Sequence, residues 1–396
     1  MPPGFRSLAL VAVLAAVVPV LLDLLPARLR LPQVVVLLLG GVALGPYGLH
    51  VIDPAPVQLF SSVGLGFLFL LAGYEVDPAL LGSREGRRAA TAWVISLVLG
   101  VAVALTALSA HVVGAFGALA IALTTTALGT LLPILRDNDL LTGPFALTVV
   151  ANGAVGELAP ILAMAVFLGA HLPRRQLAEL VAFALLAGLL VVAQRRLAGG
   201  RLHTILRQRS EATSQAALRV VVALLFVLLT LTADLGFDAV LGAFAAGMVV
   251  RVWVGGHHTA LEDKLDAVGF GVFIPVFFIY SGLTLDVPAI EKDPTVLVVC
   301  LAALVVVRGG PVMVIYRRLP ARRRLALALL SATALPLLVA LTQIGLDTHT
   351  MTPTLAASLV GAGALTVLAF PMTALALLRP PGVQRLGPAD VPVASS

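Results

Sequence analysis

The sequence predicts an all-α polytopic membrane protein with about thirteen transmembrane helices and an inverted-topology repeat. The 396 residues are 60% hydrophobic and only 12% charged. The mean hydropathy of +1.05 is far above that of a soluble domain. Apolar runs of membrane-spanning length follow one another along the whole chain. Short motifs of the first half also return in the second half in the same order.

The spans are placed by the length of each apolar run, because about twenty apolar residues cross the hydrocarbon core as a helix. The first run, which follows Arg6, is expected to be retained, since no small-x-small cleavage motif precedes the next run. The predicted spans are 7–25, 32–50, 57–77, 89–110, 113–135, 144–170, 177–194, 216–234, 237–254, 268–285, 294–316, 325–345 and 354–378.

The distribution of Lys and Arg between alternate loops predicts the orientation. Most of the 26 basic residues lie in loops on one side. The positive-inside rule therefore places the C-terminus in the cytoplasm and the N-terminus outside an inner (plasma) membrane. These arginines are interpreted as topology signals, and nucleic acid is not an expected partner. The basic residues in loops on the other side are Arg6, Arg174, Arg175 and Lys292.

Three pairs of motifs suggest an internal repeat. The partners lie seven spans apart, and because seven is odd, the two copies cross the membrane in opposite directions. We therefore expect a first repeat at 1–176, a linker helix and cytoplasmic loop at 177–215, a second repeat at 216–378 and a cytoplasmic tail at 379–396. The pairs are Leu39–Gly45 with Leu241–Gly247, Gly73–Pro78 with Gly282–Pro288, and Thr126–Gly129 with Thr333–Pro336.

Two spans are predicted to be broken helices. Span 5 contains three threonines, Thr124 to Thr126, followed by Gly129, and span 12 contains Thr333 and Pro336. Hydroxyl groups beside a Gly or Pro at membrane depth favour unwound backbone that lines a polar cavity. The alternative is two kinked helices whose threonines bond to the preceding turn.

Glu157 is the main candidate for an ion-binding residue. It lies near the middle of the apolar run 144–170, where an acidic side chain costs about 2.5–3.5 kcal/mol. The functional interpretation is that Glu157 carries a proton and a metal cation in turn, helped by Asn152, Thr125 and Thr126. The alternative is a permanently protonated Glu157 that only bonds to a neighbouring helix.

Arg308 also lies within a span and needs a partner. That partner could be Glu157, Glu75 or helix-end carbonyl groups, which would make Arg308 a charge-balancing residue. Alternatively, its side chain extends to the cytoplasmic surface. Glu75 and Asp77 lie near the end of a span and are interpreted as helix-terminal carboxylates, although Glu75 is deep enough to line an entrance.

No enzyme active site is expected. The seven histidines lie in or next to loops, and the sequence has no HExxH, no GxSxG and no phosphate-loop motif. The single cysteine, Cys300, excludes an intrachain disulfide. No cofactor is therefore expected.

With these residues considered, the chain resembles the cation:proton antiporter-2 family, the sodium/hydrogen exchanger-like group with a Kef-type membrane domain. The similarity covers nearly all of the predicted transmembrane region. The segments that resemble family motifs are Leu39–Pro46, Phe67–Pro78, Thr124–Leu128, Leu241–Gly247 and Pro275–Asp286.

The resemblance implies a homodimer with a mobile six-helix core that exchanges Na⁺ or K⁺ for H⁺ by alternating access. Glu157 takes the place of the ion-binding Asp of the family, and Gly156 takes the place of an Asp, Asn or Gln. The family's charge-moving members carry an acidic pair and a Lys on the tenth span. The Lys is absent near Ile279 and Tyr280, so electroneutral exchange is expected.

Two other functions stay open from the sequence. The same fold could be a proton-coupled exporter of an organic ion or an ionophore-like metabolite, since Glu157 would couple protons in either case. A channel is the third hypothesis, and the predicted repeat with a midplane carboxylate argues against it.

Overall fold

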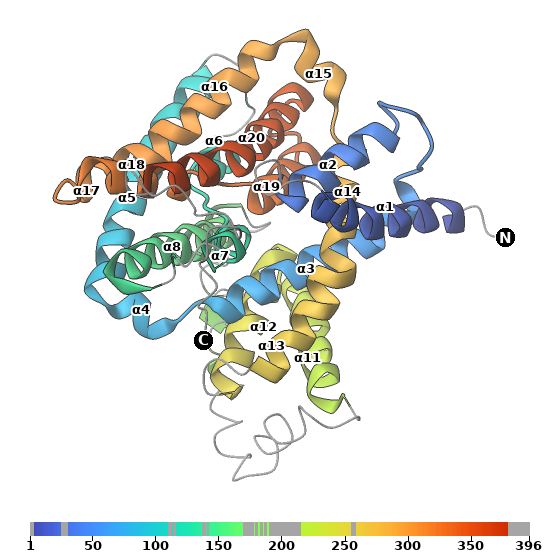
Figure 1. Ribbon diagram of the computed structural model, residues 1–396, viewed down its shortest axis with the longest axis horizontal. Coiled ribbons are helices and arrows are strands. Elements are labelled where there is room, and N and C mark those ends of the chain that lie inside the picture. The colour runs from blue at the N-terminus through green and yellow to red at the C-terminus, as the bar shows by residue number, and fades with distance from the viewer. Residues whose placement is uncertain are drawn as a thin grey trace, which may run out of the picture.

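The computed structural model describes residues 4–24, 31–109, 116–136, 142–168, 215–254 and 259–378, with a few single positions between these ranges (Figure 1). The predicted span at 177–194, the cytoplasmic loop that follows it and the tail at 379–396 lie almost entirely outside the described residues. Every named element in the described part of the chain is helical.

The elements are given in chain order. They are α1 (Gly4–Leu24), α2 (Gln33–Leu44), η1 (Ala55–Val57), α3 (Gln58–Glu75), α4 (Pro78–Gly82), α5 (Arg84–Ser109), α6 (Phe116–Ala122), α7 (Leu128–Arg136), α8 (Gly143–Phe167), α11 (Ala216–Asp234), α12 (Ala239–Val254), α13 (Thr259–Val268), η2 (Gly269–Phe273), α14 (Ile274–Leu283), α15 (Val287–Lys292), α16 (Pro294–Leu304), η3 (Val305–Gly309), α17 (Gly310–Ile315), α18 (Ala321–Ser331), α19 (Pro336–Asp347) and α20 (Pro353–Leu378).

The polytopic membrane architecture is confirmed. In the described part of the chain, nine helical segments are long and apolar enough to cross a membrane, and α2 and α12 are shorter apolar helices. Helices α6 and α7 are the two halves of predicted span 5. Because span 7 lies outside the described residues, the total of thirteen spans stays a prediction.

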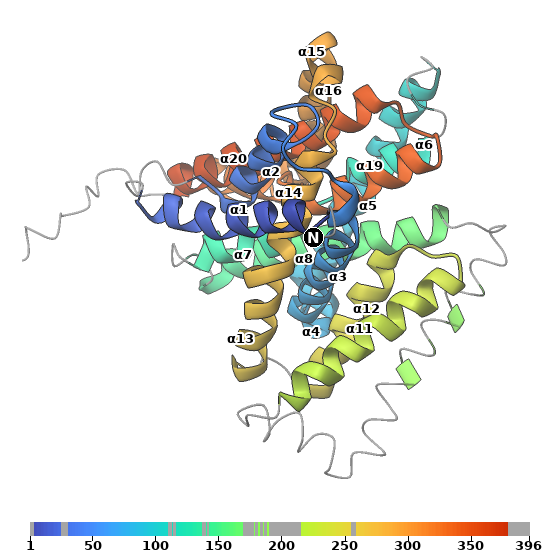
Figure 2. The ribbon, with the colours of Figure 1, turned by 90° about the vertical axis from the view of Figure 1, so that its right-hand side faces the viewer.

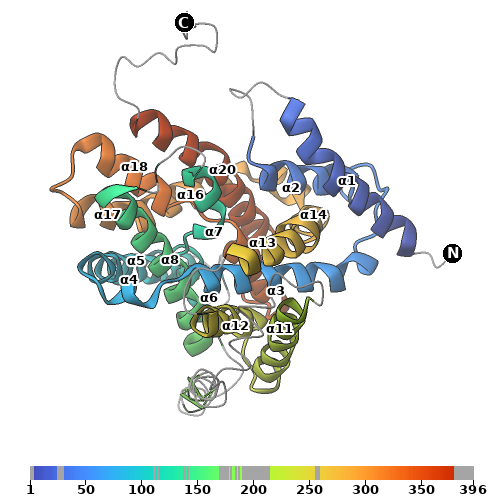
Figure 3. The ribbon, with the colours of Figure 1, turned by 60° about the horizontal axis from the view of Figure 1, so that its bottom comes forward.

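The helices pack in two groups. The first group contains α1–α3 and α11–α14, and the second contains α5–α8 and α16–α20. Figure 2 shows α11, α12 and α13 at one end of the molecule and α16, α19 and α20 at the other. In Figure 3, α3 runs between α12 on one side and α13 on the other.

Glycines set the closest approaches within the first group. A Cβ built on Gly247 of α12 would strike the carbonyl group of Leu70 in α3, and one built on Gly41 of α2 would strike that of Ile279 in α14. These contacts fit the predicted repeat, in which α2 would correspond to α12 and α3 to α14: α12 packs on α3, and α2 packs on α14. The backbones approach closely because no side chain separates them.

These contacts correct the motif alignment by one helical turn. The sequence comparison placed Gly45 opposite Gly247, but Gly41 makes the contact that corresponds to that of Gly247. A displacement of four residues nearly preserves the face of a helix. The sequence pattern alone therefore did not distinguish the two alignments.

Candidate ion-binding site

The two broken helices predicted from the sequence are present, and their interruptions meet. Helix α6 ends at Ala122 and α7 begins at Leu128, while α18 ends at Ser331 and α19 begins at Pro336. The backbone N–H of Ala127 donates to the Thr333 carbonyl at 2.8 Å. Pro336 lies in the first turn of α19, where its missing N–H leaves no intrahelical bond unmade.

The three threonines in the interruption between α6 and α7, here called the first break, form different hydrogen bonds. Thr124 and Thr125 donate to the carbonyl groups of Ile121 and Ala122 at 2.8 and 2.9 Å. These are the preceding-turn bonds that the alternative interpretation expected, and they satisfy carbonyl groups at the end of α6. Only Thr126 reaches the other break, where its hydroxyl donates to the Ser331 carbonyl at 2.6 Å.

Glu157 lies in the middle of α8 and is only 5% exposed. The backbone amides of Leu128 and Gly129, in the first turn of α7, interact with its carboxyl group. The N-terminus of a helix stabilises negative charge through its free N–H groups and its dipole. The Oε2 atom of Glu157 is buried and has no hydrogen-bond partner in the described part of the chain. One face of the carboxyl group is therefore free for a proton or a cation.

A second carboxyl group, that of Glu75, lies beside the same turn of α7. Its negative charge acts on Glu157, and a Cβ built on Gly129 would lie 3.9 Å from Glu75 Oε2. This oxygen is also buried without a partner among the described residues. The interpretation of Glu75 as a helix-terminal carboxylate is correct for its position at the end of α3 but missed this pairing. The signal that could have found it was its place within the Phe67–Pro78 motif.

Arg251 of α12 fixes the end of α3. Its guanidinium Nη1 donates to the carbonyl groups of Tyr74 and Glu75 at 2.7 and 3.2 Å. Its Nη2 lies 3.7 Å from Asp77 Oδ2. Arg251 is 7% exposed, and a cation at a helix C-terminus is stabilised by the last carbonyl groups. This contact holds the backbone from which the Glu75 side chain extends.

Other charges surround Glu75 on the side of the molecule where α3 ends. Glu262 and Asp266 of α13 and Arg136 at the end of α7 lie within electrostatic reach of it. Glu262 and Asp266 are half-buried, whereas Arg136 is exposed. The negative charges of Glu262 and Asp266 favour the approach of a cation to this end of α3.

Arg308 is fully buried at 0% exposure and lies in the π-helical turn η3. Its Nε donates to Thr126 Oγ1 at 2.9 Å, and its Nη2 donates to the Asn152 carbonyl at 2.8 Å. These partners differ from the predicted Glu157, Glu75 and helix-end carbonyl groups, because they are the hydroxyl of Thr126 and a backbone carbonyl group within α8. The alternative in which Arg308 extends to the surface is wrong. Its charge instead lies where the two broken helices meet.

Gly156 is required by this arrangement. A Cβ built on Gly156 would strike Arg308 Nη2 and Thr126 Oγ1. The Thr126 N–H donates to the Gly156 carbonyl at 2.9 Å, so α8 and the first break are in direct backbone contact. The space that a side chain next to Glu157 would fill is occupied by Arg308.

Asn152 is not brought to Glu157 by any described contact. Its Nδ2 donates to the Thr148 carbonyl and to the Tyr316 hydroxyl, both at 2.9 Å. Its Oδ1 is buried and has no partner among the described residues. The side chain therefore joins α8 to the end of α17, and the backbone carbonyl group of Asn152 accepts the hydrogen bond from Arg308.

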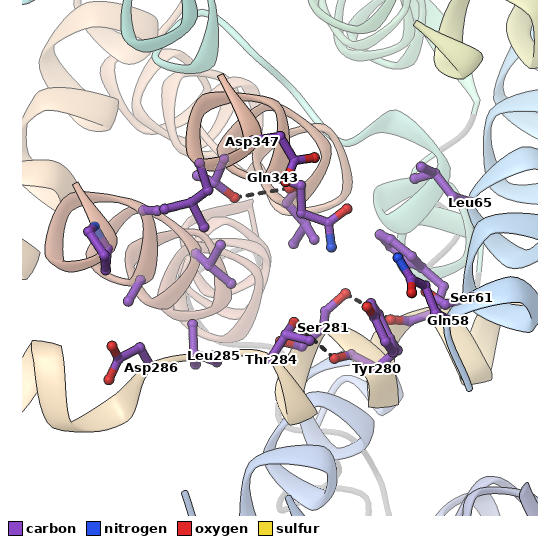
Figure 4. Close-up of a pocket in the computed structure, with 18 of the residues that line it drawn as sticks. Gln58, Ser61, Leu65, Tyr280, Ser281, Thr284, Leu285, Asp286, Gln343 and Asp347 are labelled. Carbon is purple, nitrogen blue, oxygen red and sulfur yellow. Dashed lines mark hydrogen bonds between the residues drawn. The ribbon is translucent and has the colours of Figure 1, made fainter. Parts of the chain in front are cut away.

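A polar pocket of about 250 Å³ lies at the other end of α3. Figure 4 shows Tyr280 and Ser281 facing Gln343, with Ser61 on a neighbouring helix and Asp347 at the end of α19. Ser61 is fourteen residues before the end of α3, which is about 20 Å along a helix. The pocket is therefore distant from the Glu157–Glu75 pair and lies between the two helix groups.

In the described part of the chain, no group of three or more His, Cys, Asp or Glu side chains, the usual ligands of a transition metal, is arranged to hold a metal ion. Carboxylate, hydroxyl and carbonyl oxygens are instead the ligands that hard cations prefer. The candidate site offers all three kinds of oxygen.

Comparisons with known proteins agree with this geometry. Residues 12–379 match the family described as "Sodium/hydrogen exchanger, transmembrane". The chain is 26% identical over 89% of its length to the protein YjbQ of Bacillus subtilis. It is 28% identical over 70% of its length to the Na⁺/H⁺ antiporter NhaS5 of Synechocystis. The chain spans 60% and 40% of the lengths of these two relatives.

A solved structure shares the fold. The sodium proton antiporter MjNhaP1 of Methanocaldococcus jannaschii superposes with a TM-score of 0.60 at 19% sequence identity. The superposition covers 93% of this chain and 94% of that protein.

Proposed function

Because the chain belongs to the transmembrane sodium/hydrogen exchanger family, we propose that it is a cation:proton antiporter and neither an enzyme nor a channel. The single observation that carries this proposal is the pair of buried carboxyl groups, Glu157 and Glu75, beside the first turn of α7. Two carboxylates in an apolar environment repel one another unless a proton or a cation lies between them. The pair therefore offers one place for which H⁺ and a metal cation compete.

The exchange follows from this competition. A proton on Glu157 lowers the charge of the pair from −2 to −1 and so relieves the repulsion, and a cation can bind only after that proton leaves. The oxygens of the break supply further ligands, and Arg308 keeps a fixed positive charge at the crossing through its bonds to Thr126 and Asn152. Because the bound cation and the bound proton exclude one another, the gradient of one ion drives the other.

Access from the two sides uses different parts of the molecule. Glu262 and Asp266 lie within electrostatic reach of Glu75 at one end of α3, and the pocket around Tyr280, Gln343 and Asp347 lies between the helix groups at the other end. We infer that movement of the second helix group against the first exposes the carboxyl pair to these two routes in turn.

The transported ion is Na⁺ or K⁺, and the exchange is one cation for one proton without net charge. The absence of a lysine beside Ile279 and Tyr280 supports electroneutral exchange. The protein acts as a homodimer in the plasma membrane, with its N-terminus outside and its C-terminus in the cytoplasm. The relatives named above are described as sodium/proton antiporters, which favours a metal cation over an organic ion as the substrate.

The test is exchange in proteoliposomes with a pH-sensitive dye, with Na⁺, K⁺ and Li⁺ added in turn. Glu157→Gln keeps the shape of the side chain but cannot bind and release a proton, so cation-dependent proton movement should vanish. Glu75→Gln should retain exchange with a raised apparent KM for the cation. Glu291→Gln, which removes an exposed carboxylate of α15, is the matched control and should behave like the unaltered protein.

Normal exchange by the Glu157→Gln protein would overturn the assignment of Glu157. A rate that changes when a membrane potential is imposed with a potassium ionophore would overturn the electroneutral stoichiometry.

A further inference from the structure

A second cavity lies on the side of the molecule that the sequence predicts to be cytoplasmic. Its volume is about 350 Å³, and it lies where the start of α5, the first turns of α8 and the segment after α17 come together. It lies at one end of the second helix group, and neither Glu157 nor Glu75 lines it. The residues that line it are Arg88, Thr148, Ile315, Tyr316, Arg317, Arg318 and Leu319.

The polar lining of this cavity favours an anion. Three of its seven lining residues are arginines, and none is acidic. Arg88 is half-buried, whereas Arg317 and Arg318 are exposed. Glu85, one turn before Arg88, is the acidic residue whose charge reaches Tyr316, but it does not line the cavity. Arg88 lies on α5, and Arg317 and Arg318 lie in the turn after α17, so guanidinium-bearing residues from two parts of the chain line one cavity. Guanidinium groups match the several oxygens of a phosphate group.

Tyr316 adds a neutral donor to this lining. It is 5% exposed, and its hydroxyl oxygen accepts a hydrogen bond from Asn152 Nδ2 at 2.9 Å. A tyrosine hydroxyl that accepts one hydrogen bond still carries a proton that it can donate. The hydroxyl proton is then available for an oxygen atom of a ligand in the cavity.

The position of the cavity indicates which phosphate it would take. Arg317 and Arg318 directly follow the membrane-spanning segment Pro294–Ile315, and Arg88 lies near the start of the span Arg84–Ser109. The cavity is therefore at the depth of the lipid head groups, and it also carries the apolar side chains of Ile315 and Leu319. Basic pockets between transmembrane helices at this level suit the head groups of anionic lipids.

We propose that this cavity binds the phosphate group of an anionic membrane lipid, held by Arg88, Arg317 and Arg318 with Tyr316 as a further donor. The bound head group would contact Tyr316, whose hydroxyl is hydrogen-bonded to Asn152, and Asn152 lies on the same helix as Glu157. This inference concerns a binding site and does not depend on the proposed transport activity.

The test measures lipid binding to the purified full-length protein in detergent by native mass spectrometry. The probes are short-chain phosphatidylglycerol, short-chain phosphatidylcholine and inorganic phosphate. Phosphatidylglycerol should bind most tightly. The double variant Arg317→Gln/Arg318→Gln and the single variant Arg88→Gln should each bind it about tenfold more weakly or worse, because each loses charge-assisted hydrogen bonds.

The matched control is Arg322→Gln/Arg323→Gln. It also removes two exposed positive charges from the neighbouring α18, but these residues do not line the cavity. Its affinity should stay within about twofold of the unaltered protein. Thermal denaturation without added lipid shows whether each variant is folded.

Two results would overturn the proposal. If both double variants weaken binding equally, the lipid is held by the general surface charge and the cavity is not its site. If inorganic phosphate competes as strongly as phosphatidylglycerol at equal concentration, the site takes soluble phosphate and the lipid assignment fails.

Discussion

The replacement of Gly156 by Ala tests the crossing of the broken helices most directly. A Cβ at this position would lie 2.7 Å from the Thr126 Cβ, and it would also strike Arg308 Nη2 and Thr126 Oγ1. Carbon atoms in good contact are about 3.5–4.0 Å apart, so the neighbours must move. Overpacking of a tight site costs about 1–3 kcal/mol.

The movement that relieves this overlap also weakens a hydrogen bond. Arg308 Nη2 is the atom that donates to the Asn152 carbonyl at 2.8 Å, and a bond of this charged kind contributes about 1.5–3 kcal/mol. Because the two costs overlap, we expect a total loss of about 2–4 kcal/mol. The exchange rate should fall as well, since the Gly156 carbonyl binds the Thr126 N–H beside the site.

The assay compares the midpoint of thermal denaturation in detergent and the exchange rate in proteoliposomes. Gly271→Ala is the matched control, because Gly271 is exposed in η2 and nothing lies within 4 Å of a Cβ built there. That variant should be as stable and as active as the unaltered protein. If Gly156→Ala denatures at the same temperature as Gly271→Ala and exchanges ions normally, the contact with Arg308 does not require a glycine and the reasoning is refuted.

Three further predictions concern the surroundings of the site. Arg251→Gln should destabilise the protein by about 1–3 kcal/mol and raise the apparent KM for the cation, because the carbonyl groups at the end of α3 lose their charged donor. If the denaturation midpoint and the KM are both unchanged, Arg251 does not position the end of α3. Thr126→Val should lower the denaturation midpoint because Arg308 and the Ser331 carbonyl both lose a buried partner, whereas Thr230→Val, at an exposed threonine of α11, should not. Acidification from pH 8 to pH 6 should raise the apparent KM for the cation, measured from initial exchange rates, by up to about tenfold per pH unit, which is the limit for competition with one proton. A KM that does not change with pH would exclude competition at one site.

The two helix interruptions and the buried position of Glu157 could be predicted from the sequence because the free-energy cost of placing each in the membrane depends on the residue and its immediate neighbours. A carboxyl group or an unwound turn is unfavourable in hydrocarbon wherever its partners lie, so its presence in an apolar run is informative by itself. The repeated glycines carried similar information about the close approach of helices. Their alignment was wrong by one turn because a helical face nearly repeats after four residues.

What the sequence by itself determined is the class of the protein, its spans in the described part of the chain, the two broken helices and the position of Glu157 within a span. Only the tertiary structure showed which groups contact the buried charged side chains. Arg308 meets Thr126 across 182 positions of the chain, and Glu75 meets the first turn of α7 from another helix group. Hydropathy records only the cost of placing each residue in the membrane. The group that offsets this cost depends on which helices pack together, and that is set by side-chain shape and glycine contacts over long sequence distances.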